Sequence, residues 1–264
     1  MARRARLDAE LVRRGLARSR EQAGELIGSG RVRVGGQVAT KSATSVDPGA
    51  SLHVEADEGE VWVSRGAHKL LGALTAFALD PAGRRCLDAG ASTGGFTDVL
   101  LRRGARHVVA VDVGYGLLAW SLRTDERVTV VERVNARALE PEQVGEAVEL
   151  VVADLSFIPL GLVLPALVGC ARTDADLVPM VKPQFEVGRE RLPSGGVVRD
   201  PAARAAAVRR VAEQAGQLGL GVRGVVASPL PGPSGNVEYF LWLRCGAPPL
   251  VEGDLARAVA EGPQ

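Results

Sequence analysis

Short apolar runs alternate with helical patterns over the last two thirds of this 264-residue chain. The runs have the length and β-branched composition of buried strands, and they occupy residues 85–90, 107–112, 128–132, 148–154, 176–181, 222–227 and 238–243. Helical patterns separate most of them, notably over 95–103, 160–171 and 201–218. The alternation predicts an α/β fold with a doubly wound, mainly parallel sheet of seven strands, whose ligands bind at the carboxyl ends of the strands.

The first 59 residues predict a separate, smaller α+β unit. Leu7 and Leu11 belong to the apolar stripe of a first helix, and Ser19 with Gln22 has the spacing of a capping box at the start of a second helix. Residues 31–39 alternate in polarity around a Gly-Gly pair, which is typical of a β-hairpin with a tight turn. The unit is therefore expected to contain two helices followed by a hairpin.

Charge is strongly segregated, although the net charge is only +1. Residues 1–41 carry ten basic and four acidic side chains, residues 42–60 carry five acidic and no basic ones, and the rest is balanced. Two helices and a hairpin that share a positive sign favour a nucleic-acid backbone as ligand, with a solvated arginine-rich face as the alternative. The candidate RNA-binding residues are Arg4, Arg6, Arg14, Arg18, Arg20, Arg31, Arg33, Lys41 and Arg65.

Composition argues against membrane proteins and zinc enzymes. The longest uncharged apolar run, residues 156–171, contains two prolines and is too short for a membrane span, and the first residues have no apolar signal-peptide core. Three histidines, three cysteines and no Cys-x-x-Cys motif argue against a metal site. We expect Cys86, Cys170 and Cys245 to be buried free thiols in a reducing cytoplasm.

A glycine-rich segment follows the first predicted strand of the large unit. Its spacing is neither Gly-x-Gly-x-x-Gly nor a Walker loop, which argues against a dinucleotide pyrophosphate. Asp88 before the turn suits an ammonium group and Asp112 suits ribose hydroxyls, so S-adenosylmethionine fits; for the loop alone, a tight turn without a ligand is the alternative. The candidate cofactor-binding residues are Asp88, Gly90, Ser92, Thr93, Gly94, Gly95, Phe96, Asp112 and Asp154.

Only three of the 32 basic side chains are lysines, namely Lys41, Lys69 and Lys182. Arginine does not release its proton in proteins, so a lysine kept among 29 arginines is a candidate base. Lys69 precedes the first strand of the large unit, whereas Asp154, Lys182 and Glu238 fall at strand ends, so the four can meet at one rim. Ammonium groups held together help one of them to release its proton, and carboxylates orient the base, which suits deprotonation of a hydroxyl that attacks a methyl group. For each residue alone, a strand-end ion pair is the alternative.

Several motifs carry a resemblance to known families. Arg6-Leu-Asp, Gly15-Leu-Ala-Arg-Ser-Arg-Glu-Gln-Ala and Gly30-Arg-Val-Arg-Val-Gly-Gly resemble the S4-type RNA-binding domain. The catalytic part is similar to FtsJ-type ribose 2′-O-methyltransferases, whose tetrad has the chain order Lys-Asp-Lys-Glu. The whole chain resembles the TlyA family, known as haemolysins and as rRNA methyltransferases, through Ser64-Arg-Gly-Ala-His-Lys, Asp88-Ala-Gly-Ala-Ser-Thr-Gly-Gly-Phe-Thr, Asp112-Val-Gly-Tyr-Gly, Asp154-Leu-Ser-Phe-Ile, Lys182-Pro-Gln-Phe-Glu and Gly235-Asn-Val-Glu.

The resemblance implies a Rossmann-like class I methyltransferase sheet behind an S4-type domain. The expected boundaries are an RNA-binding domain at 1–59, a linker at 60–63 and an S-adenosylmethionine-dependent methyltransferase domain at 64–264. The implied reaction is methyl transfer to the 2′-hydroxyl of cytidine in 16S rRNA, 23S rRNA or both. By position Lys69, Asp154, Lys182 and Glu238 form the tetrad, with Lys182 as the base.

The implied partner is rRNA or a ribosomal subunit, with no DNA or membrane partner, for a monomeric chain in the cytoplasm. The alternatives are a membrane-lytic haemolysin and an inactive RNA-binding homologue; base methylation is disfavoured because Asp154-Leu-Ser-Phe stands where an Asn/Asp-Pro-Pro-Tyr/Phe motif is expected. One departure concerns the linker, where the family commonly has Arg-x-Trp-Val and this chain has Glu60-Val-Trp-Val. A role of the linker arginine in coupling RNA and cofactor binding is therefore not expected to carry over.

Overall fold

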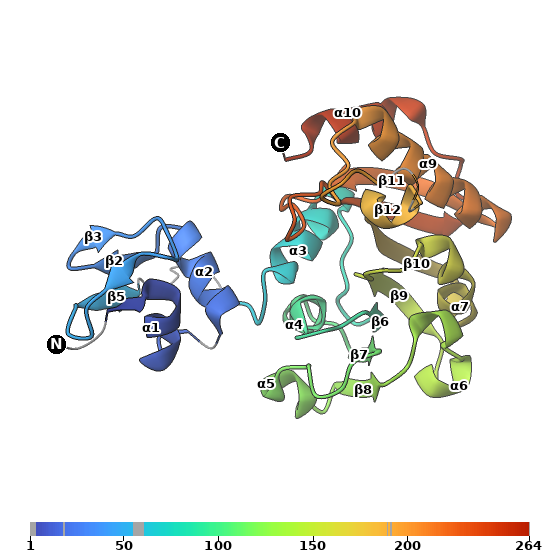
Figure 1. Ribbon diagram of the computed structural model, residues 1–264. Helices are drawn as coiled ribbons and strands as arrows, with labels where there is room; N and C mark the ends of the chain where they lie inside the picture. Colours follow the sequence, from blue (N-terminus) through green and yellow to red (C-terminus); the bar gives the residue numbers. More distant parts are fainter. Residues whose placement is uncertain (1–3, 18, 55–60, 189, 191, 264) are drawn as a thin grey trace. The chain divides into compact units, whose positions relative to one another are not determined.

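The computed structural model describes residues 4–17, 19–54, 61–188, 190 and 192–263. The chain divides into two compact units, Met1–Val61 and Trp62–Gln264 (Figure 1). In the first unit, β2 pairs antiparallel with β3 and with β5, and β1 pairs antiparallel with β4. Its elements are β1 (Ala5–Arg6), α1 (Leu7–Arg13), α2 (Arg20–Gly28), β2 (Val32–Val34), β3 (Gln37–Val38), β4 (Ser45–Val46) and β5 (Leu52–Val54).

The first unit has the two helices and the hairpin that its sequence predicts. Ser19 caps α2 by accepting a hydrogen bond from the backbone N–H of Gln22, and Gly35 and Gly36 form the hairpin turn with positive φ angles. Leu7, Leu11, Ile27, Val32 and Val46 are buried together and form its core. The strands β1, β4 and β5 were not predicted, because two or three residues are too few to show an alternating pattern.

The second unit is built on one seven-stranded sheet with the order β11-β12-β10-β9-β6-β7-β8. Only β12 runs antiparallel to its neighbours, so the expected seven-stranded, mainly parallel sheet is confirmed. Its strands are β6 (Arg85–Ala89), β7 (His107–Asp112), β8 (Val128–Glu132), β9 (Val148–Ala153), β10 (Ala171–Val181), β11 (Leu220–Ala227) and β12 (Tyr239–Cys245).

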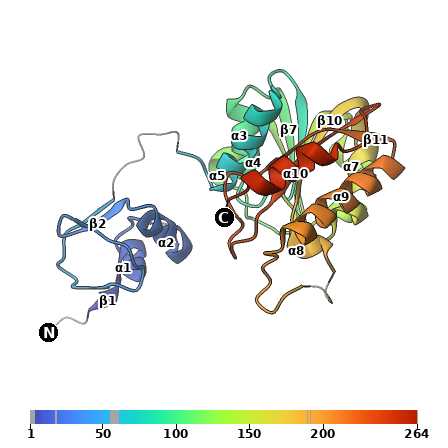
Figure 2. The same cartoon turned by 90° about the horizontal axis from the view of Figure 1, so that it is seen from above.

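Helices cover both faces of this sheet (Figures 1 and 2). On one face pack α3, α4 and α5, and on the other face pack α6, α7, α9 and α10, because successive strand residues point to opposite sides and each side has its own apolar cluster. The helices are α3 (Gly66–Phe77), α4 (Gly95–Arg102), α5 (Trp120–Arg123), α6 (Pro141–Val144), α7 (Leu164–Gly169), α8 (Pro183–Glu186), α9 (Pro201–Gln217) and α10 (Glu252–Glu261), with short 3-10 turns η1 (Ala136–Ala138) and η2 (Leu160–Leu162).

One predicted helix is too long at its end. The apolar pattern over 160–171 predicts a continuous helix, whereas the chain forms η2, then α7, and leaves the helix at Cys170. Ala171 already pairs with Val148 of β9, and the register shifts before Asp176. The first residues of β10 are polar and exposed, so their sequence does not show the apolar run by which a buried strand is predicted.

The carboxyl ends of β6, β7, β9 and β10 lie along one edge of the sheet. The antiparallel β12 starts at this edge, because Tyr239 pairs with Val181 at the end of β10. Asp154 directly follows β9, Lys182 directly follows β10 and Glu238 directly precedes β12. The sheet topology therefore brings these three positions to the same edge.

Candidate functional site

The glycine loop between β6 and α4 makes a tight turn that only glycine tolerates at two positions. Gly90 and Gly94 have φ angles of 87° and 101°, which L-residues rarely adopt. A Cβ on Gly90 would collide with the carbonyl oxygen of Asp154, and a Cβ on Gly94 would collide with the side chain of Leu122. The loop is therefore pressed against the end of β9 on one side and against α5 on the other.

The other predicted residues of this loop lie in different surroundings. Ser92 and Thr93 are exposed, while a Cβ on Gly95 would collide with the Ser64 hydroxyl. Phe96 is buried, and the centroid of its ring lies 6.1 Å from that of Phe240. Phe96 thus packs in the core between α4 and the sheet, which the sequence pattern did not distinguish from a place beside the ligand.

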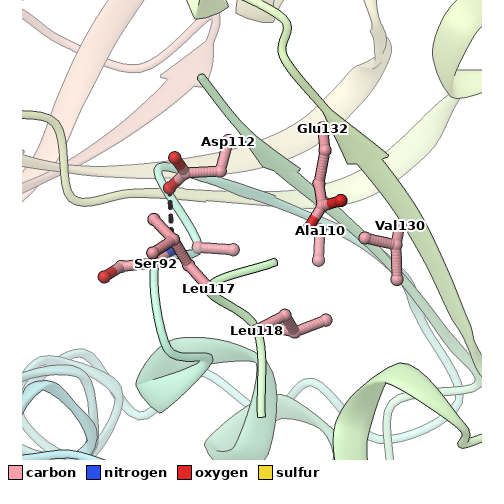
Figure 3. A pocket seen from close by; sticks show the side chains of 8 residues that line it. Ser92, Ala110, Asp112, Leu117, Leu118, Val130 and Glu132 are labelled. Carbon is pink, nitrogen blue, oxygen red and sulfur yellow. Dashed lines mark hydrogen bonds between the residues drawn. The ribbon is translucent and has the colours of Figure 1, made fainter. Parts of the chain in front are cut away.

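Asp112, the last residue of β7, borders a small pocket that is open to solvent. Its carboxylate accepts a hydrogen bond of 2.8 Å from the backbone N–H of Ser92 (Figure 3). It accepts a second one of 2.7 Å from the backbone N–H of Gly114. The two bonds fix the carboxylate beside the glycine loop. Five of the eight residues that line the pocket are apolar. The lining residues are Ala91, Ser92, Ala110, Asp112, Leu117, Leu118, Val130 and Glu132.

Asp88 lies on β6 under the glycine loop and is completely buried. The Thr97 hydroxyl donates a hydrogen bond of 2.7 Å to Oδ2, whereas Oδ1 has no partner among the described residues. Burial raises the pKa of Asp88 to about 7, since the charged form loses its water, and the hydrogen bond from Thr97 opposes this shift. A buried acceptor without a donor is suited to a cationic ligand group or an ordered water.

The four candidate catalytic residues form two ion pairs. Lys69, on α3, contacts Glu238 at 2.6 Å between Nζ and Oε2. Lys182 contacts Asp154 at 2.6 Å between Nζ and Oδ1. Among the described residues no ion pair links one of these pairs to the other, so each ammonium group has its own carboxylate.

These pairs are buried to different degrees. Lys69, Lys182 and Glu238 are buried, while the Asp154 side chain remains 23% exposed. The second oxygen of Glu238, Oε1, has no hydrogen-bond partner among the described residues and lies against Gly232, where a Cβ would approach it to 2.6 Å. The two lysines are therefore equally buried, and the pairs differ in that the carboxylate of Asp154 is partly open to solvent, whereas that of Glu238 is enclosed.

Ser156 is a site residue that the sequence did not single out. Lys182 Nζ donates a hydrogen bond of 3.0 Å to its Oγ. Ser156 is exposed, and the next residue, Phe157, has an almost fully exposed side chain and a φ of 65°. Its place two residues after Asp154 was the available signal, because a short turn after a strand keeps residues i and i+2 near one another.

The basic residues of the first unit divide into exposed and internal groups. Arg4 pairs with Asp47, and Arg6 and Arg20 both pair with the buried carboxylate of Asp8. The hydrogen bond from Arg6, followed by that from Arg20, holds the pKa of Asp8 well below its usual range. All three arginine side chains are more than half exposed, so they can contact a phosphate backbone without a change in the fold of the domain.

Arg14 has an internal role that its sequence position did not indicate. Its guanidinium contacts Glu10 at 2.7 Å and donates hydrogen bonds of 2.7 Å to the carbonyl oxygens of Pro48 and Ala50. These bonds tie α1 to the segment before β5, so that Arg14 is a brace of the domain.

The remaining candidates lie on the hairpin, beyond it and in the second unit. Arg31 and Arg33 are half-buried, Lys41 and Arg65 are exposed, and Arg65 directly precedes α3 of the second unit. Arg18 and the linker residue Glu60 lie outside the described residues.

Trp62 belongs to the packing of the second unit. Arg102 lies over its ring at 4.5 Å, and the backbone N–H of Val63 donates a hydrogen bond to Asp98 on α4. The end of the expected linker is therefore held against α4.

The cysteines differ from expectation at one position. Cys86 and Cys170 are buried free thiols, and burial raises the pKa of Cys86 to about 12. Cys245 is free but exposed, because it is the last residue of β12, where the chain turns away at Gly246. Within the described ranges no group of histidine, cysteine and carboxylate side chains is arranged to hold a metal ion. No helix among the same residues is long and apolar enough to cross a membrane.

Comparisons with known proteins agree with this division of the chain. Residues 62–245 match the FtsJ-like methyltransferase family, and residues 5–52 match the S4 domain. The 16S/23S rRNA (cytidine-2′-O)-methyltransferase TlyA of Mycobacterium tuberculosis is 65% identical over 268 residues, which cover 100% of both chains. Hemolysin A of Brachyspira hyodysenteriae is 34% identical over 89% of this chain and 98% of its own.

A solved structure also matches the full length. A protein from Streptococcus thermophilus that carries a hemolysin name superposes with a TM-score of 0.79 at 36% identity, and the match covers 99% of this chain and 96% of the other. The match thus extends over both units.

Proposed function

The chain belongs to the FtsJ-like methyltransferase family and, within it, to the TlyA proteins, and we propose that it transfers a methyl group from S-adenosylmethionine to the 2′-hydroxyl of cytidines in 16S and 23S rRNA. The observation that carries the proposal is the ion pair between Lys182 and Asp154 at the carboxyl edge of the sheet. It supplies a candidate base beside the predicted cofactor loop, in a chain 65% identical to an enzyme named for this reaction.

The residues of the β6–α4 loop and of β7 fit S-adenosylmethionine. The Asp112 carboxylate accepts two backbone hydrogen bonds and still has lone pairs that can accept hydrogen bonds from the ribose hydroxyls. The largely apolar pocket beside it suits the adenine ring. The unpartnered oxygen of Asp88 favours a cation above it. The cofactor supplies a methyl group made electrophilic by a cationic sulfur atom.

Lys182 has the central chemical role in this proposal. It takes the proton of the 2′-hydroxyl, while Asp154 holds the lysine side chain and stabilises the positive charge that the proton brings. Lys69 keeps its proton in the ion pair with Glu238, and this pair helps to orient the substrate without exchanging a proton.

The first unit supplies RNA affinity. Arg4, Arg6, Arg20 and Lys41 expose positive charge on a small, independently packed domain, which favours a phosphate backbone without specifying a base. We infer that this domain holds the ribosomal RNA while the second unit acts on one ribose.

The test is to incubate purified small and large ribosomal subunits, isolated from cells that lack the protein, with the protein and tritiated S-adenosylmethionine. Methylated nucleotides are then mapped across both rRNAs by mass spectrometry of nuclease fragments. We expect 2′-O-methylcytidine at discrete positions in 16S and 23S rRNA, and no label with Lys182→Arg. Label on a base, or no incorporation into any rRNA, would refute the proposal.

A further inference from the structure

The chain segments that follow β9 and β10 lie side by side and contact each other at three levels. Lys182 reaches Asp154 and Ser156 at the first level. At the second level, the ring centroids of Phe185 and Phe157 lie 5.1 Å apart. At the third level, Glu186 accepts a hydrogen bond of 2.8 Å from the backbone N–H of Leu160. The position of Ser156 relative to Lys182 is thus set by contacts on both sides of the turn.

The turn at Ser156 is held in an unfavourable backbone conformation. Phe157 is one of four non-glycine residues with positive φ among the described residues, and its side chain is 90% exposed. Non-glycine residues in the left-handed region cost free energy and persist where neighbouring contacts over-determine them, often at functional sites. Here two contacts hold the turn that presents the Ser156 hydroxyl to Lys182. They are the ring contact between Phe157 and Phe185 and the hydrogen bond from Leu160 to Glu186.

The orientation of a lysine Nζ atom is fixed only when it contacts more than one partner. A lysine side chain rotates about four carbon–carbon bonds and about its Cε–Nζ bond, so one ion pair limits the distance of the nitrogen atom from its partner but does not fix the direction of its N–H bonds. Lys182 Nζ has two contacts with the 154–156 turn: a hydrogen bond of 3.0 Å to Ser156 Oγ, and an ion pair of 2.6 Å with Asp154 Oδ1 that lacks hydrogen-bond geometry. The hydrogen bond to Ser156 is therefore the directional contact: when the neutral amine donates one N–H to this hydroxyl, rotation about the Cε–Nζ bond is restricted and the direction of the lone pair is limited.

We propose that Ser156 is a positioning residue for methyl transfer, and that its hydroxyl, together with Asp154, directs the lone pair of Lys182 at the 2′-hydroxyl of the substrate ribose. This inference rests on the proposed function of Lys182 as the base. In the proton transfer the O–H bond of the substrate breaks and an N–H bond forms at Nζ. Ser156 keeps its own proton throughout, and it accepts a hydrogen bond from Lys182 both before and after the transfer.

The kinetic test compares Ser156→Ala with Ser156→Thr, which keeps a hydroxyl. Ser121→Ala, on α5, is the matched control at an exposed serine of the same unit. We expect Ser156→Ala to lower kcat roughly 10- to 100-fold, the range that misplacement of a catalytic group produces, while KM for rRNA and for S-adenosylmethionine is retained. Ser156→Thr should recover most of the rate. Equal rates for Ser156→Ala and the control, or a loss confined to KM, would overturn the proposal.

A second measurement needs neither RNA nor cofactor. The chain has only three lysines, so competitive acetylation followed by mass spectrometry gives the reactivity of Lys182 with Lys41 and Lys69 as internal references. We expect Ser156→Ala to raise the reactivity of Lys182 about fivefold, the factor that one hydrogen bond is worth, and Ser156→Thr to restore it. Unchanged reactivity would refute the positioning role even in an active enzyme. Loss of the positioning effect and loss of rRNA methylation are therefore measured independently.

Discussion

Asp88 is expected to destabilise the second unit at neutral and alkaline pH. Its carboxyl is completely buried, and burial raises its pKa from 3.8 to about 7. Because the folded chain binds this proton more tightly than the unfolded chain does, the free energy of unfolding falls as pH rises from about 4 to about 7. Replacement by asparagine, which does not ionise, should remove the fall while its side-chain oxygen still accepts the hydrogen bond of Thr97.

The size of the effect follows from the two pKa values. A difference of one pKa unit corresponds to about 1.4 kcal/mol, so complete ionisation of Asp88 costs about 4 kcal/mol. The buried amide of asparagine adds its own cost of about 1–3 kcal/mol if one N–H finds no partner. That cost does not change with pH. The change in the stability difference between pH 4 and pH 8 therefore isolates the ionisation, and we expect Asp88→Asn to gain about 4 kcal/mol relative to wild type over this interval.

Urea unfolding followed by tryptophan fluorescence measures this quantity. Trp62, Trp120 and Trp242 are the three tryptophans of the chain and all belong to the second unit, so the signal reports that unit. Comparison with wild type at each pH cancels the titration of the other groups. The matched control is Asp80→Asn at an exposed carboxylate, for which we expect a change of no more than about 0.5 kcal/mol between the two pH values.

The same substitution should weaken S-adenosylmethionine binding, because the neutral amide does not stabilise a cation. A gain in stability that is equal at pH 4 and pH 8 would show that Asp88 does not ionise within this range and would refute the reasoning. If the stability gain of Asp88→Asn depends on pH but its affinity for S-adenosylmethionine equals that of wild type, the charge of Asp88 affects stability and does not contribute to cofactor binding. In that case the unpartnered oxygen of Asp88 holds a water molecule.

Three further predictions concern the catalytic pair and the first unit. Lys182→Arg should keep S-adenosylmethionine binding, measured by calorimetry, and reduce methyl transfer by at least about 100-fold, because guanidinium does not act as a base; turnover at the wild-type rate would contradict this. Deletion of residues 1–58 should weaken affinity for rRNA and flatten its dependence on salt, because fewer phosphate contacts release fewer counterions; an unchanged salt slope would contradict it. Arg14→Ala should lower hydrogen-exchange protection of α1, whereas Lys41→Ala should leave protection unchanged, since only Arg14 braces the helix through Glu10, Pro48 and Ala50.

The sequence predicted the central strands of the sheet well because they are buried on both faces. The strands β6, β7 and β9 consist almost entirely of buried residues and therefore appear as continuous apolar runs. The edge strand β8 has no buried residue and was predicted from its β-branched side chains. Asp112 and Lys182 were placed at strand ends for the same reason, since a charged residue after an apolar run marks where the strand leaves the core. The polar start of β10 and the very short strands of the first unit lack that signal.

Side-chain partners were much less predictable. Nothing in the spacing of Arg14 distinguishes it from Arg20, yet Arg14 ties α1 to the segment before β5, whereas the side chain of Arg20 is largely exposed. Phe96 shares a motif with the glycine loop but points into the core, because α4 turns its side chain toward Phe240. Such outcomes depend on which elements pack against each other, and a local pattern does not contain that information.

The retention of two lysines among arginines has two separate physical reasons. Among the described ion pairs, the arginine side chains are all at least 22% exposed, whereas Lys69 and Lys182 are exposed by only 10% and 9%. A guanidinium buried to that extent would need acceptors for five N–H donors, while an ammonium needs three. Compactness alone therefore explains why a lysine rather than an arginine pairs with Glu238, which is only 1% exposed. We expect Lys69→Arg to lower the free energy of unfolding, because the larger guanidinium disturbs the packing around Glu238. Lys182 is buried to the same extent, so compactness applies to it as well. Its partner Asp154 is 23% exposed and its carbonyl oxygen lies against Gly90 of the predicted cofactor loop, so the chemistry of a base that must release its proton is a second reason for a lysine at this position.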